Sequence, residues 1–308
     1  MQQKILLPKK TVKKVDSYIN SLKFPDVKVI KDVKITDEGQ KIDIYLPQNP
    51  EGKMGVFVNF HGGFFKYGNK NSRRGFCSYL ADKGIATVNV GYGRYPKYCF
   101  PDQIRQACLA LKWVEENATQ MGFDLEKVAV GGDGIGGYIA CQAIVANIAP
   151  SYRNKLEVVG VNFRVRGAVF FRSIFDMDLV ISITNKAKTE EKSIHRLLMG
   201  KKKESIESSQ YFEYISPIKF VSEDFPDTFI AYNTEDRMRS EQASRLINLL
   251  NRYGIPKWEF RSIYGSFVRE GRDEKKHSKE VMYCIEDSAR FLLTIFNGTI
   301  QEDKYIQI

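Results

Sequence analysis

The sequence predicts an α/β fold in which a mostly parallel central sheet carries helices on both faces. Short runs rich in Val, Ile, Phe and Tyr alternate along the chain with longer stretches of helical periodicity. Such alternation favours parallel strands joined by crossover helices. With 308 residues, of which 43% are hydrophobic, the chain can bury a substantial core, and we expect one large domain over residues 1–308.

The first half of the chain is predicted to hold an N-terminal extension, four strands and a long helix. Residues 1–25 alternate lysine with apolar residues and are expected to pack on the body as a helix. The extended runs are residues 27–35, 41–46, 56–60 and 86–92. We expect the first two to be antiparallel edge strands and the other two to be interior strands of a covered sheet. Apolar residues at helical spacing predict the helix over residues 104–119.

Strands and helices alternate through the second half, with one interruption. Strands are predicted at residues 128–130, 168–171, 228–232 and 258–263, and helices at 136–146, 240–253 and 280–296. The polar, lysine-rich segment 173–215 breaks this alternation. We expect it to be a cap inserted over the carboxyl edge of the sheet, where such sheets place their ligand crevice.

Composition excludes several classes of protein. The net charge of +10 comes from basic residues that are scattered along the chain, so no nucleic-acid partner is expected. No apolar run reaches the ~18 residues of a membrane span, and the polar start does not resemble a signal peptide, so a cytoplasmic location is expected. Five irregularly spaced cysteines are predicted to be buried free thiols, and no metal or other cofactor is expected.

Gly132-Asp133-Gly134-Ile135-Gly136 follows an apolar run and opens a helical pattern. This strand-turn-helix setting is the one required by G-x-S-x-G, the nucleophile elbow, whose glycines let two backbones approach closely. The serine position is occupied by Gly134, which has no side chain. Ile135 follows it, and a backbone N–H at this position contributes to an oxyanion hole. Centring the motif on Asp133 instead would place Ile135 where the last glycine is needed, so an aspartate nucleophile is not expected.

A second glycine motif lies about 70 residues upstream, at the end of the strand predicted over residues 56–60. His61-Gly62-Gly63-Phe64 supplies backbone N–H groups of the kind that stabilise an oxyanion. Taken alone, it could equally be a glycine turn with a structural histidine. Its distance from the elbow favours the oxyanion interpretation.

Together these motifs resemble the bacterial carboxylesterases and lipases related to hormone-sensitive lipase, in the α/β-hydrolase superfamily. Further matches are Asn89-Val90-Gly91-Tyr92, Gly122-Phe123-Asp124 and Ser216-Pro217-Ile218, and the resemblance covers about residues 40–295. It implies the α/β-hydrolase fold, a Ser-His-Asp triad, small ester-like or hydrophobic ligands, and a homodimer as the expected assembly.

The resemblance also locates the other triad positions. Asp236 follows the strand predicted over residues 228–232, where the acid is expected; Glu235 is the alternative, and a helix-capping role for Asp236 stays open. The base should lie near residues 264–278, where the one histidine is His277; it could instead be a solvated residue at a helix start. His195, within the cap segment, is expected to be a structural or a surface residue.

This chain departs from the family pattern in three further ways. Phe64 stands where the family usually has a third glycine, which predicts a narrower oxyanion pocket. Gly93 and Gln106 stand where arginine and an acidic residue are usual, so a supporting ion pair is expected to be lost.

Three hypotheses follow. The first is a catalytically impaired homologue that binds a small ester-like or hydrophobic ligand, in a pocket lined by Phe64, Phe65 and Tyr92. The second is a serine carboxylic-ester hydrolase inactivated in this chain by a Ser-to-Gly replacement at Gly134. The third is a protein-interaction module that uses the basic cap. A base within reach of residue 134 would favour the second, and a filled pocket beside an exposed apolar or basic patch would favour the third.

Overall fold

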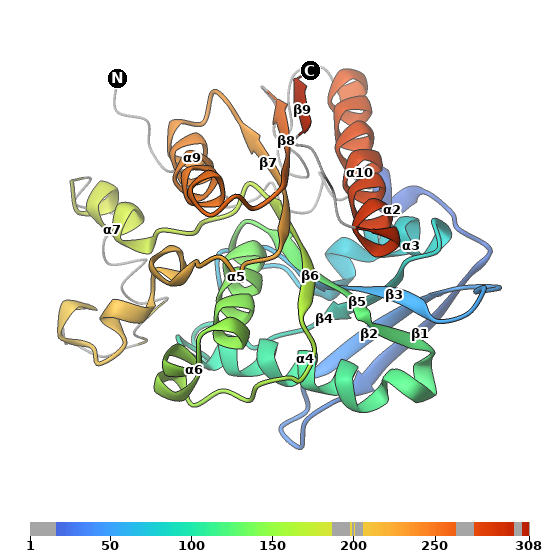
Figure 1. Cartoon of the computed structure of the whole chain (residues 1–308), viewed down its shortest axis with the longest axis horizontal. Helices are drawn as coiled ribbons and strands as arrows, with labels where there is room; N and C mark the ends of the chain where they lie inside the picture. Colours follow the sequence, from blue (N-terminus) through green and yellow to red (C-terminus); the bar gives the residue numbers. More distant parts are fainter. Residues whose placement is uncertain are drawn as a thin grey trace.

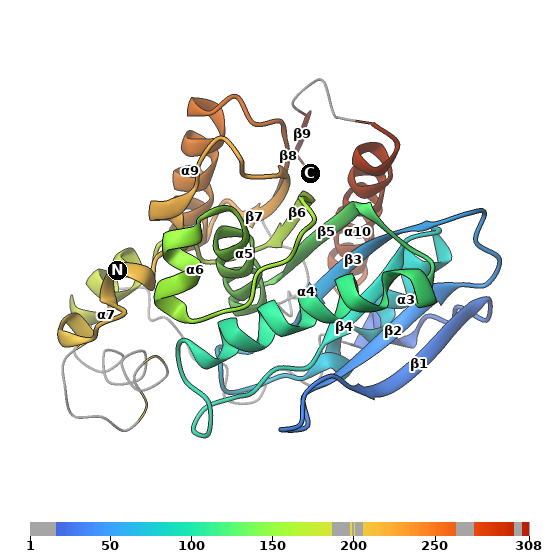
Figure 2. The same ribbon diagram turned by 60° about the horizontal axis from the view of Figure 1, so that its bottom comes forward.

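The computed structural model describes residues 17–186, 198, 200, 206–262, 274–298 and 304–307. Within these residues a single nine-stranded sheet crosses the molecule in the order β1-β2-β4-β3-β5-β6-β7-β8-β9 (Figures 1 and 2). The strands are β1 (Val27–Lys34), β2 (Lys41–Pro47), β3 (Met54–Phe60), β4 (Ala86–Val90), β5 (Phe123–Asp133), β6 (Val165–Phe171), β7 (Asp227–Asn233), β8 (Lys257–Ser262) and β9 (Lys304–Gln307).

The sheet is mostly parallel, as the alternation of elements predicts. The pairs β1–β2 and β2–β4 are antiparallel, and the other six pairs are parallel. Residue Phe60 at the end of β3 pairs with Gly132, and Asp133 at the end of β5 pairs with Phe171. The carboxyl ends of β3, β5 and β6 therefore lie side by side, and both glycine motifs leave the sheet at this edge.

Helices cover both faces of the sheet (Figures 1 and 2). One face carries α3 (Arg74–Asp82) and α10 (Glu274–Asn297), with the short α2 (Ser17–Ser21) beside α3. The other carries α4 (Asp102–Met121), α5 (Ile135–Ile148) and α9 (Arg237–Arg252), with α6 (Pro150–Leu156) beside α5. Successive residues of β3 point to opposite faces of the sheet and contribute to two separate hydrophobic cores. Val56, Val58 and Phe60 belong to one core, and Phe57 belongs to the other.

The predicted strands and helices are confirmed where the structure describes them. Of the helix expected within residues 1–25, α2 is the described part, and residues 1–16 lie outside the description. Strand β2 lies between β1 and β4, so the prediction that it is an edge strand was wrong. Some elements were missed. The sequence did not predict α3, α6 or β9. Helix α3 is short, and it carries Gly75 because a Cβ there would lie 2.2 Å from the carbonyl oxygen of Ile19. Strand β5 begins at Phe123, before its predicted start at residue 128. The prediction missed these residues because those that follow the buried Phe123 are mostly polar and not buried.

The segment between β6 and β7 contains α7 (Met177–Lys186) and the 3-10 turns η2 (Ile206–Ser208), η3 (Phe212–Tyr214) and η4 (Pro217–Phe220). The predicted cap, residues 173–215, falls here, and residues 187–197, 199 and 201–205 lie outside the described part. Two buried hydroxyls anchor the end of this segment to the main body: Tyr138 Oη donates to the Ile215 carbonyl at 2.7 Å, and Tyr152 Oη donates to the Tyr214 carbonyl at 2.9 Å. A covering role for the segment stays a prediction.

All five cysteines are free thiols, as predicted. Four of them are buried as predicted, but the prediction was wrong for Cys99, which is partly exposed. Within the described residues no helix is long and apolar enough to cross a membrane, and no group of His, Cys, Asp and Glu side chains could hold a metal ion.

Candidate functional site: the elbow and the oxyanion segment

Gly134 forms the apex of a sharp turn between β5 and α5. Its backbone angles are φ +53° and ψ −115°, close to the first central position of a type II′ turn, which glycine favours because L side chains rarely adopt it. Two hydrogen bonds fix the turn: the Gly134 N–H donates to the Phe171 carbonyl at 2.8 Å, and the Gly134 carbonyl accepts from the Tyr138 N–H at 3.2 Å. The sequence motif is therefore an elbow in three dimensions.

The neighbouring glycines are required by packing, whereas Gly134 is not. A Cβ added at Gly132 or Gly136 would lie 2.2 or 2.0 Å from the Phe60 carbonyl oxygen, and one at Gly137 would lie 1.8 Å from Ser173 Oγ. A Cβ added at Gly134 has no described atom within 4 Å. Gly132, Gly136 and Gly137 thus pack too closely against their neighbours for a side chain. At Gly134 no described atom stands in the way, so a side chain would fit there.

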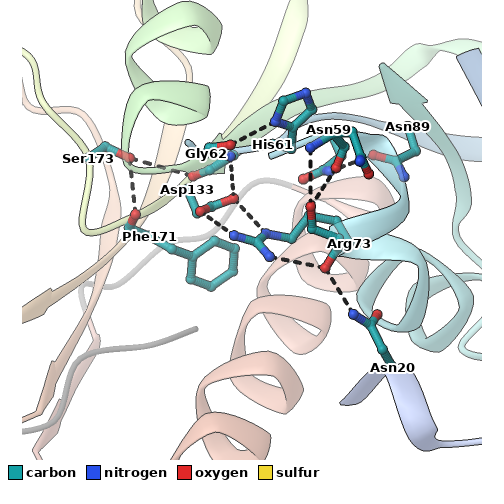
Figure 3. A network of polar contacts seen from close by, with 12 residues as sticks. Asn20, Asn59, His61, Gly62, Arg73, Asn89, Asp133, Phe171 and Ser173 are labelled. Atoms are coloured by element: carbon teal, nitrogen blue, oxygen red, sulfur yellow. Dashed lines mark hydrogen bonds and ion pairs between the residues drawn. The ribbon is translucent and has the colours of Figure 1, made fainter. Parts of the chain in front are cut away.

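Asp133 ties the elbow to the oxyanion segment (Figure 3). Its Oδ1 accepts from Arg73 Nε at 2.7 Å and from the Gly62 N–H at 2.9 Å, and its Oδ2 pairs with Arg73 Nη2 at 2.5 Å. Both side chains are 8% exposed. Burial by itself would raise the pKa of Asp133, but the charge of Arg73 and these hydrogen bonds outweigh it and hold the pKa below its usual value. The carboxylate is thus fully engaged in holding two loops together.

His61 supports the same loop from its other side. Its ring stacks on that of Tyr92, with centroids 4.3 Å apart, and Tyr92 Oη donates to the His61 carbonyl at 2.6 Å. Nδ1 lies 2.7 Å from the Gly62 carbonyl, which can only accept, so Nδ1 carries the proton. Burial lowers the pKa of His61 to about 4, so the ring is neutral near pH 7. These contacts give His61 a structural part in the oxyanion segment.

The predicted oxyanion donors separate into two groups. The Gly62 N–H is bound to Asp133, whereas the N–H groups of Gly63, Phe64 and Ile135 have no acceptor in the described part of the chain. Gly63 must be glycine, because its φ is +133° and a Cβ would lie 1.8 Å from the Tyr67 carbonyl oxygen. Phe64 keeps the glycine-like backbone of the residue it replaces, with φ +54°. The oxyanion role of the available N–H groups stays a prediction.

The aromatic residues expected to line a pocket differ in their surroundings. Phe65 is 3% exposed and packs edge-on against Tyr138, and Tyr92, at 6%, lies under His61. Phe64 is half-buried. Of these three, Phe64 is therefore the most accessible to a ligand.

Asp236 is the N-cap of α9, which is the capping role that the sequence left open. Its Oδ1 accepts from the Arg239 N–H at 3.1 Å, and its Oδ2 pairs with Arg172 Nη2 at 3.0 Å. Glu235, the alternative acid, is exposed. Both oxygens of Asp236 thus have partners other than a histidine. A catalytic role for Asp236 stays a prediction.

The general base is expected in a segment that lies outside the described part of the chain. His277 belongs to the first turn of α10, but its side chain is not described, and neither are residues 263–273 or His195.

Another departure from the family pattern concerns Gly93 and Gln106. The Gly93 N–H donates to Gln106 Oε1 at 2.5 Å. A hydrogen bond between these positions stands where the resemblance implies an ion pair.

Two arginines near the elbow were not predicted from the sequence. Arg172 leaves the carboxyl end of β6 with φ +49°, and Arg239 lies in the first turn of α9. Burial, together with repulsion from Arg172, lowers the pKa of Arg239 to about 10, while Asp236 and Asp133 act in the opposite direction. Arg172 directly follows the strand predicted over residues 168–171, and this position could have indicated a site residue.

Comparison with known proteins agrees with this geometry. The sequence model of the BD-FAE family matches residues 42–250. Esterase LipI of Mycobacterium tuberculosis is 35% identical over 109 residues, which are 34% of this chain and 33% of LipI. The ethyl acetate hydrolase of Pseudomonas putida is 33% identical over 124 residues, 38% of each chain. The matched part thus spans about a third of the length of these relatives.

Solved structures match over most of the chain. A bacterial heroin esterase superposes with a TM-score of 0.70 at 23% identity, covering 93% of this chain and 89% of its own. Esterase B of Lactobacillus rhamnosis gives 0.69 at 18% identity, covering 90% and 91%. At such identities these structures establish the fold alone, and the family match covers more than half of the chain. The chain is therefore a member of the BD-FAE family, with the α/β-hydrolase fold of carboxylesterases and lipases.

Proposed function

We propose that this chain is a catalytically impaired member of the family that binds a small ester-like or hydrophobic ligand at the elbow. The observation that carries the proposal is Gly134 at the apex of the turn, with open space beside it. Serine hydrolases form their acyl intermediate on the hydroxyl at this position, and glycine offers no atom that could replace it.

The neighbouring groups support loss of turnover with retention of binding. Both oxygens of Asp133 are bonded to Arg73 and Gly62, so this carboxylate is not available as a substitute nucleophile. Asp236 is held by Arg172. Ligand binding needs none of the triad groups. The N–H groups of Gly63 and Phe64 have no acceptor among the described residues, so they can bind a carbonyl oxygen. Without the nucleophile, such groups alone supply an acceleration of roughly 10³–10⁴ over water.

The alternative function is a serine carboxylic-ester hydrolase that the glycine has inactivated. The open space at Gly134 favours it, because a serine could be restored without displacing a described neighbour. The two functions predict different outcomes for Gly134→Ser. This variant would regain hydrolysis if the rest of the triad is intact, as the alternative function requires.

Hydrolysis of p-nitrophenyl butyrate separates the two functions. The proteins are the unmodified chain, Gly134→Ser, Gly134→Ala as the control that adds a Cβ without a hydroxyl, and Gly134→Ser combined with Asp236→Ala. We expect the unmodified chain and Gly134→Ala to be equally slow, with at most the roughly 10³–10⁴-fold acceleration over water that remains without a nucleophile. Turnover by the unmodified chain faster than this residual rate would contradict the proposal.

Intact mass spectrometry after treatment with a phosphonate ester reports the nucleophile directly. An adduct on Gly134→Ser, together with hydrolysis that Asp236→Ala abolishes, would establish a disarmed esterase with a working base. If Gly134→Ser neither forms an adduct nor hydrolyses the ester, catalysis was lost through other residues as well as the serine. Binding of ethyl butyrate to the unmodified chain, followed by calorimetry, tests the ligand side of the proposal.

A further inference from the structure

The side chain of Asn20 holds helix α2 against the start of α3. Asn20 Nδ2 donates to the Ser72 carbonyl at 3.1 Å (Figure 3), and Asn20 Oδ1 accepts from the Gly75 N–H at 2.8 Å. These partners lie 52 and 55 positions from Asn20 in the sequence. Ser72 and Gly75 flank Arg73, so one amide group contacts the backbone on both sides of the arginine that binds Asp133.

Asn20 also supplies an acceptor that the N-cap residue of α3 cannot offer. That residue is Arg73, whose guanidinium has five N–H donors and no acceptor. The first N–H groups of a helix need acceptors from outside the helix, and Asn20 Oδ1 provides one for Gly75. Because a residue of another element caps α3, the N-cap position can hold an arginine that binds Asp133.

The Ser72 carbonyl connects Asn20 to this guanidinium. It accepts from Arg73 Nη1 at 3.0 Å as well as from Asn20 Nδ2. A guanidinium is planar and rigid, so a bond to Nη1 also restricts the directions of Nε and Nη2. Those two atoms bind the carboxylate of Asp133. The place of the Ser72 carbonyl therefore affects where Asp133 is held.

Asp133 in turn determines the position of the oxyanion segment. Its Oδ1 accepts from the Gly62 N–H at 2.9 Å, and the fit is close, because a Cβ on Gly62 would lie 2.3 Å from Asp133 Oδ2. Gly62 directly precedes Gly63 and Phe64, whose N–H groups are the expected donors to a carbonyl oxygen. Such donors act at about 2.7–3.1 Å from the oxygen, so a small displacement of Gly62 weakens them.

We propose that Asn20 is a positioning residue for the oxyanion segment. It acts through the Ser72 carbonyl and Arg73, which fix Asp133 and with it the Gly62 N–H. The simpler role for Asn20 is to dock α2 and cap α3, and the test must separate the two. The inference goes beyond the proposed function by assigning α2 to the site, and it rests on that function for the ligand that the segment binds.

Two substitutions separate positioning from docking. Asn20→Asp keeps an acceptor for the Gly75 N–H and removes the donor to the Ser72 carbonyl, whereas Asn20→Ala removes both. Asn117→Ala is the matched control, because Asn117 Nδ2 also donates to a main-chain carbonyl, that of Trp113 at 2.8 Å, within α4.

Amide hydrogen exchange of Gly62, followed by NMR without ligand, is the first readout. Its rate is divided by that of the Phe229 amide in β7, so that a general loss of stability does not count. We expect Asn20→Asp and Asn20→Ala to raise this ratio about 2- to 10-fold and Asn117→Ala to leave it unchanged. If the ratio for Asn20→Asp equals that of the unmodified chain, Asn20 only docks α2 and the inference is wrong. An equal rise with Asn117→Ala would also overturn it.

A double-mutant cycle tests whether Asn20 acts through Arg73. Arg73→Lys keeps a positive charge beside Asp133 and loses the planar group that joins it to the Ser72 carbonyl. Adding Asn20→Asp to Arg73→Lys should then change the exchange of Gly62 little further. An equal effect of Asn20→Asp with and without Arg73→Lys would contradict the inference. Should Arg73→Lys not fold, the comparison of Asn20→Asp with the unmodified chain still gives the answer.

This inference and the proposed function fail in different ways. The exchange of Gly62 is measured without ligand, so it tests the role of Asn20 whether or not a ligand binds. Where ethyl butyrate binds the unmodified chain, Asn20→Asp should weaken that binding about 2- to 10-fold, and equal affinity would overturn the positioning role. The absence of ethyl butyrate binding to the unmodified chain, or turnover above its residual rate, would count against the proposed function alone.

Discussion

Replacing Gly134 with alanine measures the backbone strain stored at the apex of the elbow. The angles φ +53° and ψ −115° lie in a region that costs a residue with a Cβ about 1–3 kcal/mol. Alanine also restricts the unfolded chain, which offsets about 0.4–1 kcal/mol of that cost. No clash adds to it, because the new Cβ meets no described atom within 4 Å. With the middle of both ranges, about 2 kcal/mol less about 0.7 kcal/mol, we expect Gly134→Ala to lower the free energy of unfolding by about 1.3 kcal/mol.

Gly136→Ala is the matched comparison, because the two glycines lie in the same turn. At Gly136 the added Cβ would lie 2.0 Å from the Phe60 carbonyl oxygen, which is backbone and cannot rotate away. Its cost is steric, and we expect about 3 kcal/mol or more. Gly134→Ser should resemble Gly134→Ala, since both add a Cβ in the same conformation.

Urea denaturation followed by the fluorescence of the two tryptophans gives these free energies, once refolding has been shown to be reversible. If Gly134→Ala lowers the free energy of unfolding as much as Gly136→Ala, the space at position 134 is filled and the prediction is wrong. If Gly134→Ala leaves the free energy of unfolding unchanged, the turn carries no strain and the prediction is also wrong.

Three further predictions concern the groups that hold the oxyanion segment. Arg73→Met leaves the charge of Asp133 buried and should cost about 3–5 kcal/mol in urea denaturation, and adding Asp133→Asn should recover part of that loss; strictly additive costs would contradict the ion pair. Because burial lowers the folded pKa of His61 from 6.5 to about 4, its contribution is fully present above pH 6.5 and lost as the pH falls toward 4, by roughly 3 kcal/mol. Denaturation at a series of pH values measures this loss, which His61→Gln should abolish. Tyr92→Phe removes the hydroxyl donor of the buried His61 carbonyl and should cost about 1–3 kcal/mol, and a neutral result would show that the hydrogen bond contributes nothing.

The fold could be predicted from the sequence because its signals are local. The apolar run before Gly132 and the glycines after it define a strand, a turn and a helix without knowledge of any partner. Helix α3 gave no comparable signal, because it is short and its Gly75 is explained by contact with Ile19, a residue remote in sequence. The capping role of Asp236 was open from the sequence, and the backbone N–H of Arg239 identifies it.

The sequence by itself determined the order of most strands and helices, the two glycine motifs and the missing hydroxyl at position 134, since each is a property of residues adjacent in the chain. The tertiary structure decided how charges from separate elements combine. Asp133 meets Arg73 across 60 positions, and Arg172 meets Asp236 across 64. Electrostatic energy depends on distance in space and on burial, neither of which is expressed by spacing along the chain. For that reason these two ion pairs are recognised only in the folded protein, where the sheet brings the ends of β5, β6 and β7 together.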